Sequence, residues 1–358
     1  MEFLWSDAIE LEANKVRSNV MKKFFMDFSF VLMLNIFRVR SAYLVSAGFS
    51  ITMVRLNRSM YKRSDMVTQI GIKKRFSLFR SLDHLILMTR DLSSASSDYS
   101  KVFGCKPVWR GVHDDLGTEN VIFSFKNTYL EILAPKKKGL GADFVASIID
   151  SEGEGLTGLA FETCDIGRLK KELSEKEVST EKIVLGNGFD PNQDKSRSWR
   201  NLFFSRRLTR GLFLFAIEHE SGELPKSKVN RSQIDRLDHV VINTNDPDGF
   251  ISLYRDKFGI KLSLDQTIEK WGGRMLFFRL DKTTIEVIGK IDKETEPRDS
   301  FWGLAWSVND LNAVHRRLAD DGVELTDIRE GRKPRTIVCT VKSHTLGVPT
   351  LLIQHLDR

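Results

Sequence analysis

Apolar and polar positions follow two periodicities along this chain, and their order repeats. A short apolar run that contains an Asp-His pair comes first, a stretch with apolar residues at helical spacing follows, and two more apolar runs come after it. Short apolar runs indicate buried strands, whereas helical spacing indicates an amphipathic helix. The predicted elements are residues 82–87, 92–103, 121–125 and 127–133 in one copy, and 237–242, 250–258, 275–280 and 282–288 in the other. Each helix is expected to end at a glycine, Gly104 or Gly259.

A related second half follows each of these segments. It opens on a Gly-Leu-Ala-aromatic run, continues as an amphipathic helix and closes with a nine-residue strand that aligns without gaps between the copies. These elements are residues 158–161, 166–176 and 211–219, and residues 303–306, 311–320 and 347–355. The chain is therefore predicted to be α+β, with four strand–helix–strand–strand–strand (βαβββ) modules in two pairs. The expected first domain is residues 80–222, the linker 223–233 and the second domain 234–358.

One histidine and one glutamate recur at the same place in both copies. His84 and Glu131 are 47 residues apart, and so are His239 and Glu286. A carboxylate between apolar strand neighbours is costly to bury alone, so each glutamate needs a partner. Imidazole and carboxylate together suit a divalent metal ion. The alternative is a His–Glu hydrogen bond across the sheet, left over from an ancestral site.

The four modules, with histidine on an opening strand and glutamate on a closing strand, resemble the vicinal oxygen chelate superfamily, also called the glyoxalase/bleomycin resistance/dioxygenase superfamily. Residues 331–336, leading into residues 347–352, look most like bacterial glyoxalase-like proteins. The resemblance covers about 280 residues. It implies two tandem cupped mixed sheets of glyoxalase-like type. It also implies a divalent metal ion (Zn, Fe, Mn, Ni or Co) to which two neighbouring oxygens of a small substrate bind.

The metal-ligand positions that the resemblance implies are only half filled. In the odd-numbered modules they fall on His84, Glu131, His239 and Glu286. In the even-numbered modules they fall on Gly158, Phe215, Gly303 and Leu351, whose side chains cannot ligate. A complete catalytic site usually has three protein ligands and an open position, so two per domain is few.

Two basic stretches at matching places in the second and fourth modules contain Arg200 and Arg335. Guanidinium groups bind carboxylate or phosphate through paired hydrogen bonds. At the rim of a cup these two arginines would bind an anionic substrate; in a solvated hairpin they would have no such role.

Other aromatic and histidine residues are expected to be structural. Trp109, Trp271 and Trp306 are predicted to pack in the core rather than to line a pocket. His113, His315 and His219 have no second partner at a recognisable spacing, and a surface or strand-end position is expected for each. A missing metal ligand would come from His344, His355, His219 or a water, but His355 lies roughly 13 Å along the strand from Leu351 and is not favoured.

Composition narrows the function classes. The chain has 358 residues, of which 41% are apolar, so sizeable cores are expected. The net charge is +7, but residues 1–80 hold 14 Lys/Arg and 6 Asp/Glu, a net of +8, which leaves −1 for the rest. The charge therefore does not support a basic, nucleic-acid-binding body, and no nucleic-acid partner is expected. Cys105, Cys164 and Cys339 are far apart and are expected to be reduced thiols of a cytoplasmic protein. No dinucleotide or phosphate-loop motif occurs, and no nucleotide cofactor is expected.

Residues 1–79 form a basic N-terminal extension with a different composition. Its two apolar runs, residues 24–37 and 41–54, are too short to span a membrane. Three interpretations stay open: a targeting segment, a membrane-surface segment, or a mis-assigned start before an internal methionine such as Met53, Met60 or Met66. Contact with a membrane is expected only through this extension.

The leading functional hypothesis is a glyoxalase-like, metal-assisted enzyme of isomerase or lyase type. Its substrate would be a small, oxygen-rich, anionic metabolite, with Glu131 or Glu286 as metal ligand and proton shuttle. The alternatives are a metal-free protein that binds and sequesters a small molecule, and a ring-cleaving dioxygenase of extradiol type. The chain is expected to be a monomer or a homodimer.

Overall fold

The computed structural model describes residues 78–225, 230–269, 272–290 and 295–356. Residues 76–330 and 335–358 form one compact unit, which contains both tandem domains. The predictions for the N-terminal extension concern residues 1–77 almost entirely and lie outside the described residues. Among the helices that are described, none combines the length and the apolar character needed to cross a bilayer.

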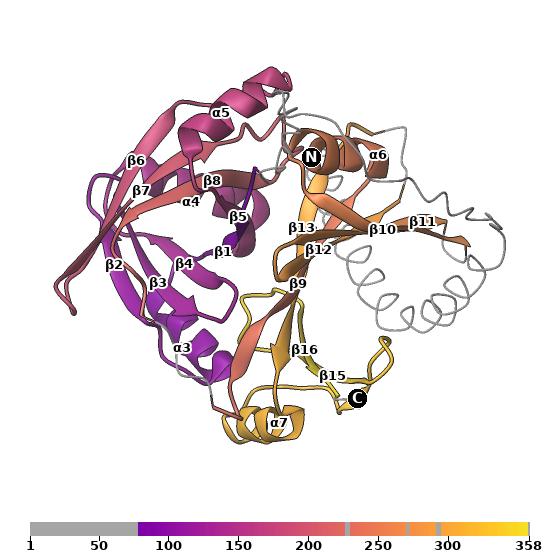
Figure 1. Cartoon of the computed structure of the whole chain (residues 1–358). Helices are drawn as coiled ribbons and strands as arrows, with labels where there is room; N and C mark the ends of the chain where they lie inside the picture. The colour runs from indigo at the N-terminus through magenta and orange to yellow at the C-terminus, as the bar shows by residue number, and fades with distance from the viewer. Residues whose placement is uncertain (1–77, 226–229, 270–271, 291–294, 357–358) are drawn as a thin grey trace, which may run out of the picture. The chain divides into compact units, whose positions relative to one another are not determined.

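The first domain contains two βαβββ modules joined by an extra helix, α4. Its elements are β1 (Ser81–Met88), α3 (Leu92–Phe103), β2 (Trp109–His113), β3 (Thr118–Ser124), β4 (Tyr129–Pro135), α4 (Leu140–Glu152), β5 (Gly155–Glu162), α5 (Ile166–Glu175), β6 (Ile183–Asp190), β7 (Lys195–Phe203) and β8 (Phe213–Ser221). The strands pair in the order β1-β4-β3-β2-β6-β7-β8-β5, and β5 pairs with β1 to close the ring (Figure 1).

The second domain repeats this plan. Its elements are β9 (Ile234–Thr244), α6 (Pro247–Ile251), the π-helix η1 (Ser252–Lys257), β10 (Lys261–Ile268), β11 (Gly273–Leu280), β12 (Thr283–Gly289), β13 (Asp299–Val308), α7 (Leu311–Asp320), β14 (Arg329–Glu330), β15 (Thr336–Val341) and β16 (Thr350–His355). The strands form one sheet in the order β10-β11-β12-β9-β13-β16-β15-β14. The α+β fold of four modules in two tandem sheets is thereby confirmed.

One sheet closes further than the predicted cup. In the first domain Val112 of β2 pairs with Phe189 of β6, and this bridge turns the sheet into a barrel. The strand at the place of β6 in the second domain is β14, which spans two residues. So short a strand does not reach the opposite edge, and the second sheet stays open.

Local capping sets the ends of the first helix of each domain. The Asp91 carboxylate accepts a hydrogen bond from the Ser94 N–H at 2.9 Å, and Gly104 ends α3 with a φ of 73°. Asp246 caps α6 in the same way, and Gly259, with a φ of 71°, follows η1. This left-handed conformation favours glycine, so the predicted helix ends are confirmed.

Helix α4, to which the sequence pattern assigned no element, packs on the inner face of the barrel. Its residues Val145 and Ile148 belong to an apolar cluster with Ile86 and Met88 of β1. His84 shares this face because side chains alternate along a strand. Its neighbours, in contrast to those of Ile86, are aromatic and polar.

The main core continues from one domain into the other. Trp306 is fully buried, and its ring centroid lies 5.1 Å from that of Phe103 and 4.5 Å from that of Phe125. The predicted core position of Trp306 is confirmed. Trp109 is also buried but lies on the inner face of the barrel, and Trp271 lies outside the described residues.

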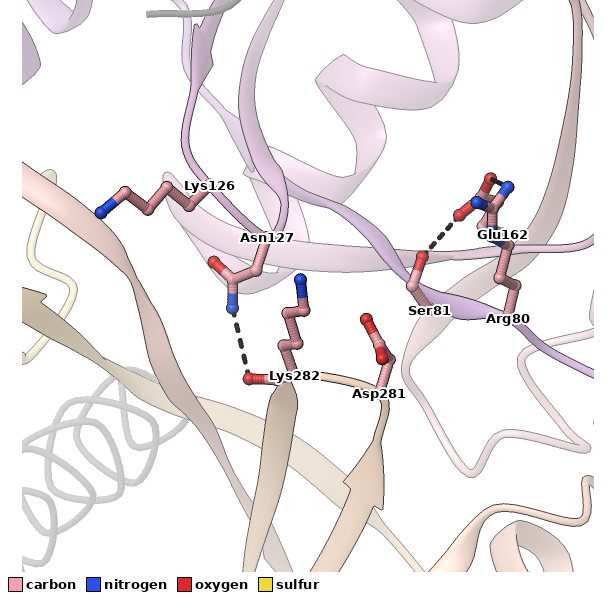
Figure 2. A pocket seen from close by; sticks show the side chains of 7 residues that line it. All are labelled: Arg80, Ser81, Lys126, Asn127, Glu162, Asp281 and Lys282. Atoms are coloured by element: carbon pink, nitrogen blue, oxygen red, sulfur yellow. Dashed lines mark hydrogen bonds and ion pairs between the residues drawn. The ribbon is translucent and has the colours of Figure 1, made fainter. Parts of the chain in front are cut away.

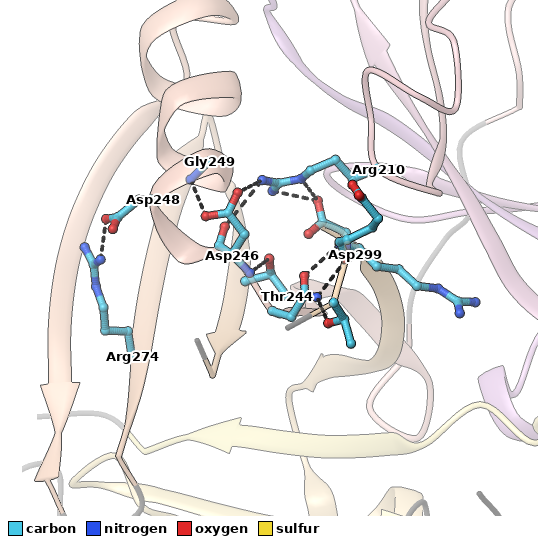
Figure 3. A network of polar contacts seen from close by, with 11 residues as sticks. Arg210, Thr244, Asp246, Asp248, Gly249, Arg274 and Asp299 are labelled. Carbon is cyan, nitrogen blue, oxygen red and sulfur yellow. Dashed lines mark hydrogen bonds and ion pairs between the residues drawn. The ribbon is translucent and has the colours of Figure 1, made fainter. Parts of the chain in front are cut away.

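An ion network also ties the two domains together. Arg210, between β7 and β8, donates from Nε and Nη2 to Asp299 Oδ2 at 3.0 and 2.8 Å, and from Nη1 to Asp246 Oδ2 at 3.0 Å (Figure 3). The side chain of Asp299 is fully buried. Its burial outweighs the charge of Arg210 and raises the pKa of Asp299 to about 6.

Candidate functional site

A β-bulge on the opening strand turns an aspartate to the same side as the histidine that follows it. In the pairing of β1 with β5, Leu82 faces Phe161 and His84 faces Ala160, so Asp83 is one extra residue. Strand alternation alone would point Asp83 and His84 to opposite faces, and bulges commonly re-aim a side chain in this way.

The second domain repeats the bulge. In the pairing of β9 with β13, Leu237 faces Trp306 and His239 faces Ala305, which leaves Asp238 as the extra residue. A local irregularity kept at the same place in two copies indicates that the Asp-His geometry is a shared property of both domains.

Four side chains of the first domain lie in a row, which we name the first array: His219, Asp83, His84 and Glu131. His84 Nδ1 donates to Asp83 Oδ1 at 2.6 Å, and His219 Nε2 donates to Asp83 Oδ2 at 2.9 Å. His84 Nε2 lies 3.4 Å from Glu131 Oε2. Asp83 therefore fixes the ring so that Nε2 faces the carboxylate.

The second array, His355, Asp238, His239 and Glu286, has the same order of contacts. His239 Nδ1 donates to Asp238 Oδ1 at 2.9 Å, and His355 Nε2 donates to Asp238 Oδ2 at 2.7 Å. His239 Nε2 lies 3.4 Å from Glu286 Oε2. The first array is the more deeply buried, because the His84 side chain is 3% exposed and that of His239 is 19% exposed.

Charges along the first array stabilise one another. Burial alone would lower the pKa of His84, but hydrogen bonds with Asp83 and Glu131 raise it to about 8. Burial would raise the pKa of Glu131, but the hydrogen bond and charge of His84, the charge of His113 and the amide of Asn120 lower it to about 2. At neutral pH the His84 imidazolium thus lies between two carboxylates.

Aromatic and polar side chains surround the first array inside the barrel. The Tyr129 ring stacks on His84 with centroids 4.5 Å apart, and the Phe215 ring stands edge-on at 5.6 Å. Asn120 Nδ2 donates to Glu131 Oε1 at 2.5 Å. Tyr129, Glu131 and Leu133, the inward-facing residues of β4, are each partly exposed, so solvent reaches the interior of the barrel.

The two predicted substrate-binding arginines lie in different settings. Arg200 Nη2 and Nε form ion pairs with Glu218 at 2.8 Å and Glu220 at 3.1 Å, on the opposite face of β7 from Trp199. Arg335 directly precedes β15, and its carbonyl accepts from the Leu356 N–H at 2.8 Å. The structure therefore places Arg200 outside the barrel and Arg335 next to the strand end that carries His355.

Sequence reasoning found His84, Glu131, His239 and Glu286. It missed the aspartate of each array and considered the second histidine only as a possible source of a missing metal ligand. Asp83 and Asp238 stand in the repeated Leu-Asp-His triplet, and His219 and His355 close the two nine-residue stretches that align without gaps. The signal for all four was their recurrence at matching places in the two copies.

Each array presents one histidine nitrogen and one carboxylate to the metal ion that the sequence resemblance implies. In the first array, His84 Nδ1 is engaged by Asp83, so His84 Nε2 and Glu131 are the donors that face each other, and Phe215 lies where a further ligand would be. Nowhere in the described ranges does a group of three or more His, Cys, Asp or Glu residues form a metal-holding arrangement. The side chains of an array therefore do not complete the ligand set of a catalytic ion by themselves.

A polar pocket of about 350 Å³ contains no residue of either array. It is lined by Arg80, Ser81, Lys126, Asn127, Glu162, Asp281 and Lys282 (Figure 2). Several of these groups are already satisfied, because Glu162 accepts from Arg80 at 3.0 Å and from Ser81 at 2.6 Å. The pocket is thus a weaker candidate site than the barrel interior.

Two family models match the chain. The model described as a glyoxalase-like domain matches residues 82–235, and that of the glyoxalase/bleomycin resistance protein/dioxygenase superfamily matches residues 238–340. No curated protein sequence matches the chain.

Solved structures with the same fold include two that align with this chain over almost their whole length. A hypothetical protein from Staphylococcus aureus has 13% identity and a TM-score of 0.54, over 76% of this chain and 98% of its own. A mutant of 4-hydroxymandelate synthase from Streptomyces coelicolor has 14% identity and a TM-score of 0.56, over 78% of this chain and 94% of its own. At such identities the likeness concerns the fold.

Proposed function

We propose that this chain, which belongs to the glyoxalase/bleomycin resistance/dioxygenase superfamily, is an enzyme of isomerase or lyase type that acts on a small anionic carbonyl compound inside the first-domain barrel. The superfamily includes metalloenzymes. The chemistry proposed here uses the side chains of the first array.

The observation that supports the proposal most directly is the His84–Glu131 pair. The two groups face each other at 3.4 Å, which is longer than a typical charge-assisted hydrogen bond, so the pair is loosely joined. One is a protonated donor and the other an ionised acceptor at neutral pH. Proton abstraction next to a carbonyl needs an ionised base and a proton donor. A substrate that enters between the two groups would remove the contact with His84 that lowers the pKa of Glu131 and would make it a stronger base.

The proposed reaction moves two protons. Glu131 takes a proton from the carbon next to the substrate carbonyl, while His84 gives its Nε2 proton to the carbonyl oxygen, and a neutral enol results. If the carbon next to the carbonyl carries a hydroxyl, the enol is an enediol. Glu131 then returns its proton to the former carbonyl carbon while the second hydroxyl gives its proton to His84, and the isomeric carbonyl results. If the substrate instead carries a leaving group one carbon further on, the enol O–H proton returns to His84 and Glu131 protonates the departing group, which gives a lyase product. Asp83 acts as a positioning residue because it holds the His84 ring and supports its positive charge.

Metal-assisted chemistry is the second candidate. A carboxylate that orients the far nitrogen of a histidine is a common outer-shell arrangement at metal ligands, and both arrays have it. In this case His84 and Glu131 would need additional oxygen donors from water or from the substrate. Zn, Fe, Mn, Ni and Co are the ions that such donors suit.

The test is exchange of carbon-bound hydrogen in D2O, followed by NMR over a panel of small 2-oxo and 2-hydroxy carboxylates, with and without chelator. We expect exchange that survives chelation and falls by roughly 10²- to 10⁴-fold in Glu131→Gln. Loss on chelation with recovery on metal addition would support the second candidate. Binding of a panel compound without any exchange would instead indicate a sequestering protein.

A further inference from the structure

Arg197 of β7 is a buried cation inside the first-domain barrel. Its side chain lies on the same strand face as Trp199, two residues on, and the residue is 6% exposed. The guanidinium carbon lies 5.7 Å from the ring centroid of Trp109 and 5.8 Å from those of Tyr129 and Trp199. We name Arg197 and these three aromatic residues the aromatic cage.

The guanidinium of Arg197 lacks a counter-ion in the described part of the chain. Its Nε is buried without a hydrogen-bond partner, and no carboxylate of the described residues forms an ion pair with this guanidinium. Cation–π contacts offset part of the cost of burying the charge. A buried charge without an opposite charge is nevertheless expensive, so the site favours an anion.

The aromatic cage adjoins the first array. The same Tyr129 ring that stacks on His84 at 4.5 Å is one wall of the cage. Two glycines leave space for the indole rings of the cage. A Cβ on Gly111 would lie 2.1 Å from Trp109 Nε1, and a Cβ on Gly186 would lie 2.2 Å from Trp199 Nε1.

The second domain has no equivalent of the cage in its described strands. Thr284 is the register partner of His239, as Tyr129 is of His84. Thr336 is the register partner of His355, as Trp199 is of His219. The arrays are duplicated, whereas the cage belongs to the first domain.

We propose that Arg197 and its aromatic cage form a subsite for the carboxylate of a small organic acid, next to the reacting groups His84 and Glu131. This inference rests on the proposed function and names its substrate class. A carboxylate is planar and matches the two-pronged face of a guanidinium, and aromatic walls accept an apolar or unsaturated body. The three aromatic rings favour an aromatic carboxylate over inorganic phosphate, because phosphate has no apolar part to pack against them.

The experiment measures binding of benzoate, benzyl alcohol and inorganic phosphate by tryptophan fluorescence and by the shift in melting temperature. Trp109 and Trp199 are part of the cage, so occupancy should change their emission. We expect benzoate to bind, phosphate to bind more weakly, and benzyl alcohol to leave both readouts unchanged. Arg197→Met should weaken benzoate binding by roughly 10- to 100-fold, since a charged hydrogen-bond partner is lost.

Three further variants make the test specific. Arg197→Lys keeps the positive charge but cannot form the paired hydrogen bonds of a guanidinium, so it should bind benzoate with intermediate affinity. This variant also tests the subsite if Arg197→Met does not fold. Arg110→Met removes an exposed cation of the same barrel and should bind benzoate like the parent chain. Glu131→Gln should keep benzoate binding while exchange is lost, so a failure of the subsite and a failure of the proposed function give different results.

Two results would overturn the inference. One is benzoate affinity that is unchanged in Arg197→Met. The other is benzoate affinity lost in Arg200→Met instead, because Arg200 lies on the outer face of β7, where it pairs with Glu218 and Glu220.

Discussion

Replacing Asp83 with asparagine should lower the pKa of His84 from about 8 toward its ordinary value of 6.5. Burial by itself lowers that pKa, and the carboxylate of Asp83, at 2.6 Å, is a main reason why it is raised. The difference between a pKa of 6.5 and one of about 8 corresponds to about 2 kcal/mol of net stabilisation of the charged imidazole. Asparagine keeps the size of the side chain and removes its charge.

The pH dependence of stability follows from the same shift. Because the folded-state pKa of His84 is raised, its contribution to the free energy of unfolding is fully present below pH 6.5 and is lost as pH rises through 8. The parent chain should therefore lose up to about 2 kcal/mol between these limits through this group, and Asp83→Asn should lose clearly less, since only Glu131 still raises the pKa of His84 there.

The assay is an NMR titration of the histidine ring nitrogens, combined with denaturant unfolding across the same pH range. Asp238→Asn is the matched control, because it changes the second array and should leave the His84 signal unchanged. A His84 pKa that stays near 8 in Asp83→Asn would refute the role given to Asp83.

Three more outcomes are expected. Arg210→Met should destabilise the chain by about 3–5 kcal/mol at pH 8, because it leaves the Asp299 carboxylate buried and unpaired. The loss measured by denaturation should be smaller at pH 5, where Asp299, with its pKa raised to about 6, is protonated; an equal loss at both pH values would count against this reasoning. Phe215→His adds a third donor beside the first array and should give retention of a divalent ion in metal analysis; unchanged metal content would contradict the ligand-set argument. Gly186→Ala should cost roughly 1–3 kcal/mol and shift Trp199 emission, because the new Cβ would overlap the indole, and a neutral result would show that the ring has room to move.

The repeat made the fold predictable. Two copies with the same strand–helix–strand order and the same 47-residue interval from histidine to glutamate fix the modules without any three-dimensional information. Gly104 and Gly259 ended their helices as predicted, because a left-handed C-terminal residue is a local property of the backbone.

Parts of the site depend on geometry that periodicity does not carry. The bulges at Asp83 and Asp238 break the strand period of two, so alternation puts these aspartates on the wrong face. Arg197 and Arg200 lie an odd number of residues apart and so point to opposite sides of β7, but the mixed polarity of that strand does not reveal which side is inner. Closure of the barrel depends on one bridge between distant strands, which no local pattern encodes.

Exchange of carbon-bound hydrogen with solvent tests most directly the proposal that the first array carries out the reaction. The Glu131→Gln and Glu286→Gln chains are assayed side by side in the presence of chelator. We predict that exchange into a small carbonyl acid falls by roughly 10²-fold or more in Glu131→Gln and falls far less in Glu286→Gln. Exchange that is kept in Glu131→Gln and lost in Glu286→Gln would contradict the proposal and assign the chemistry to the second domain.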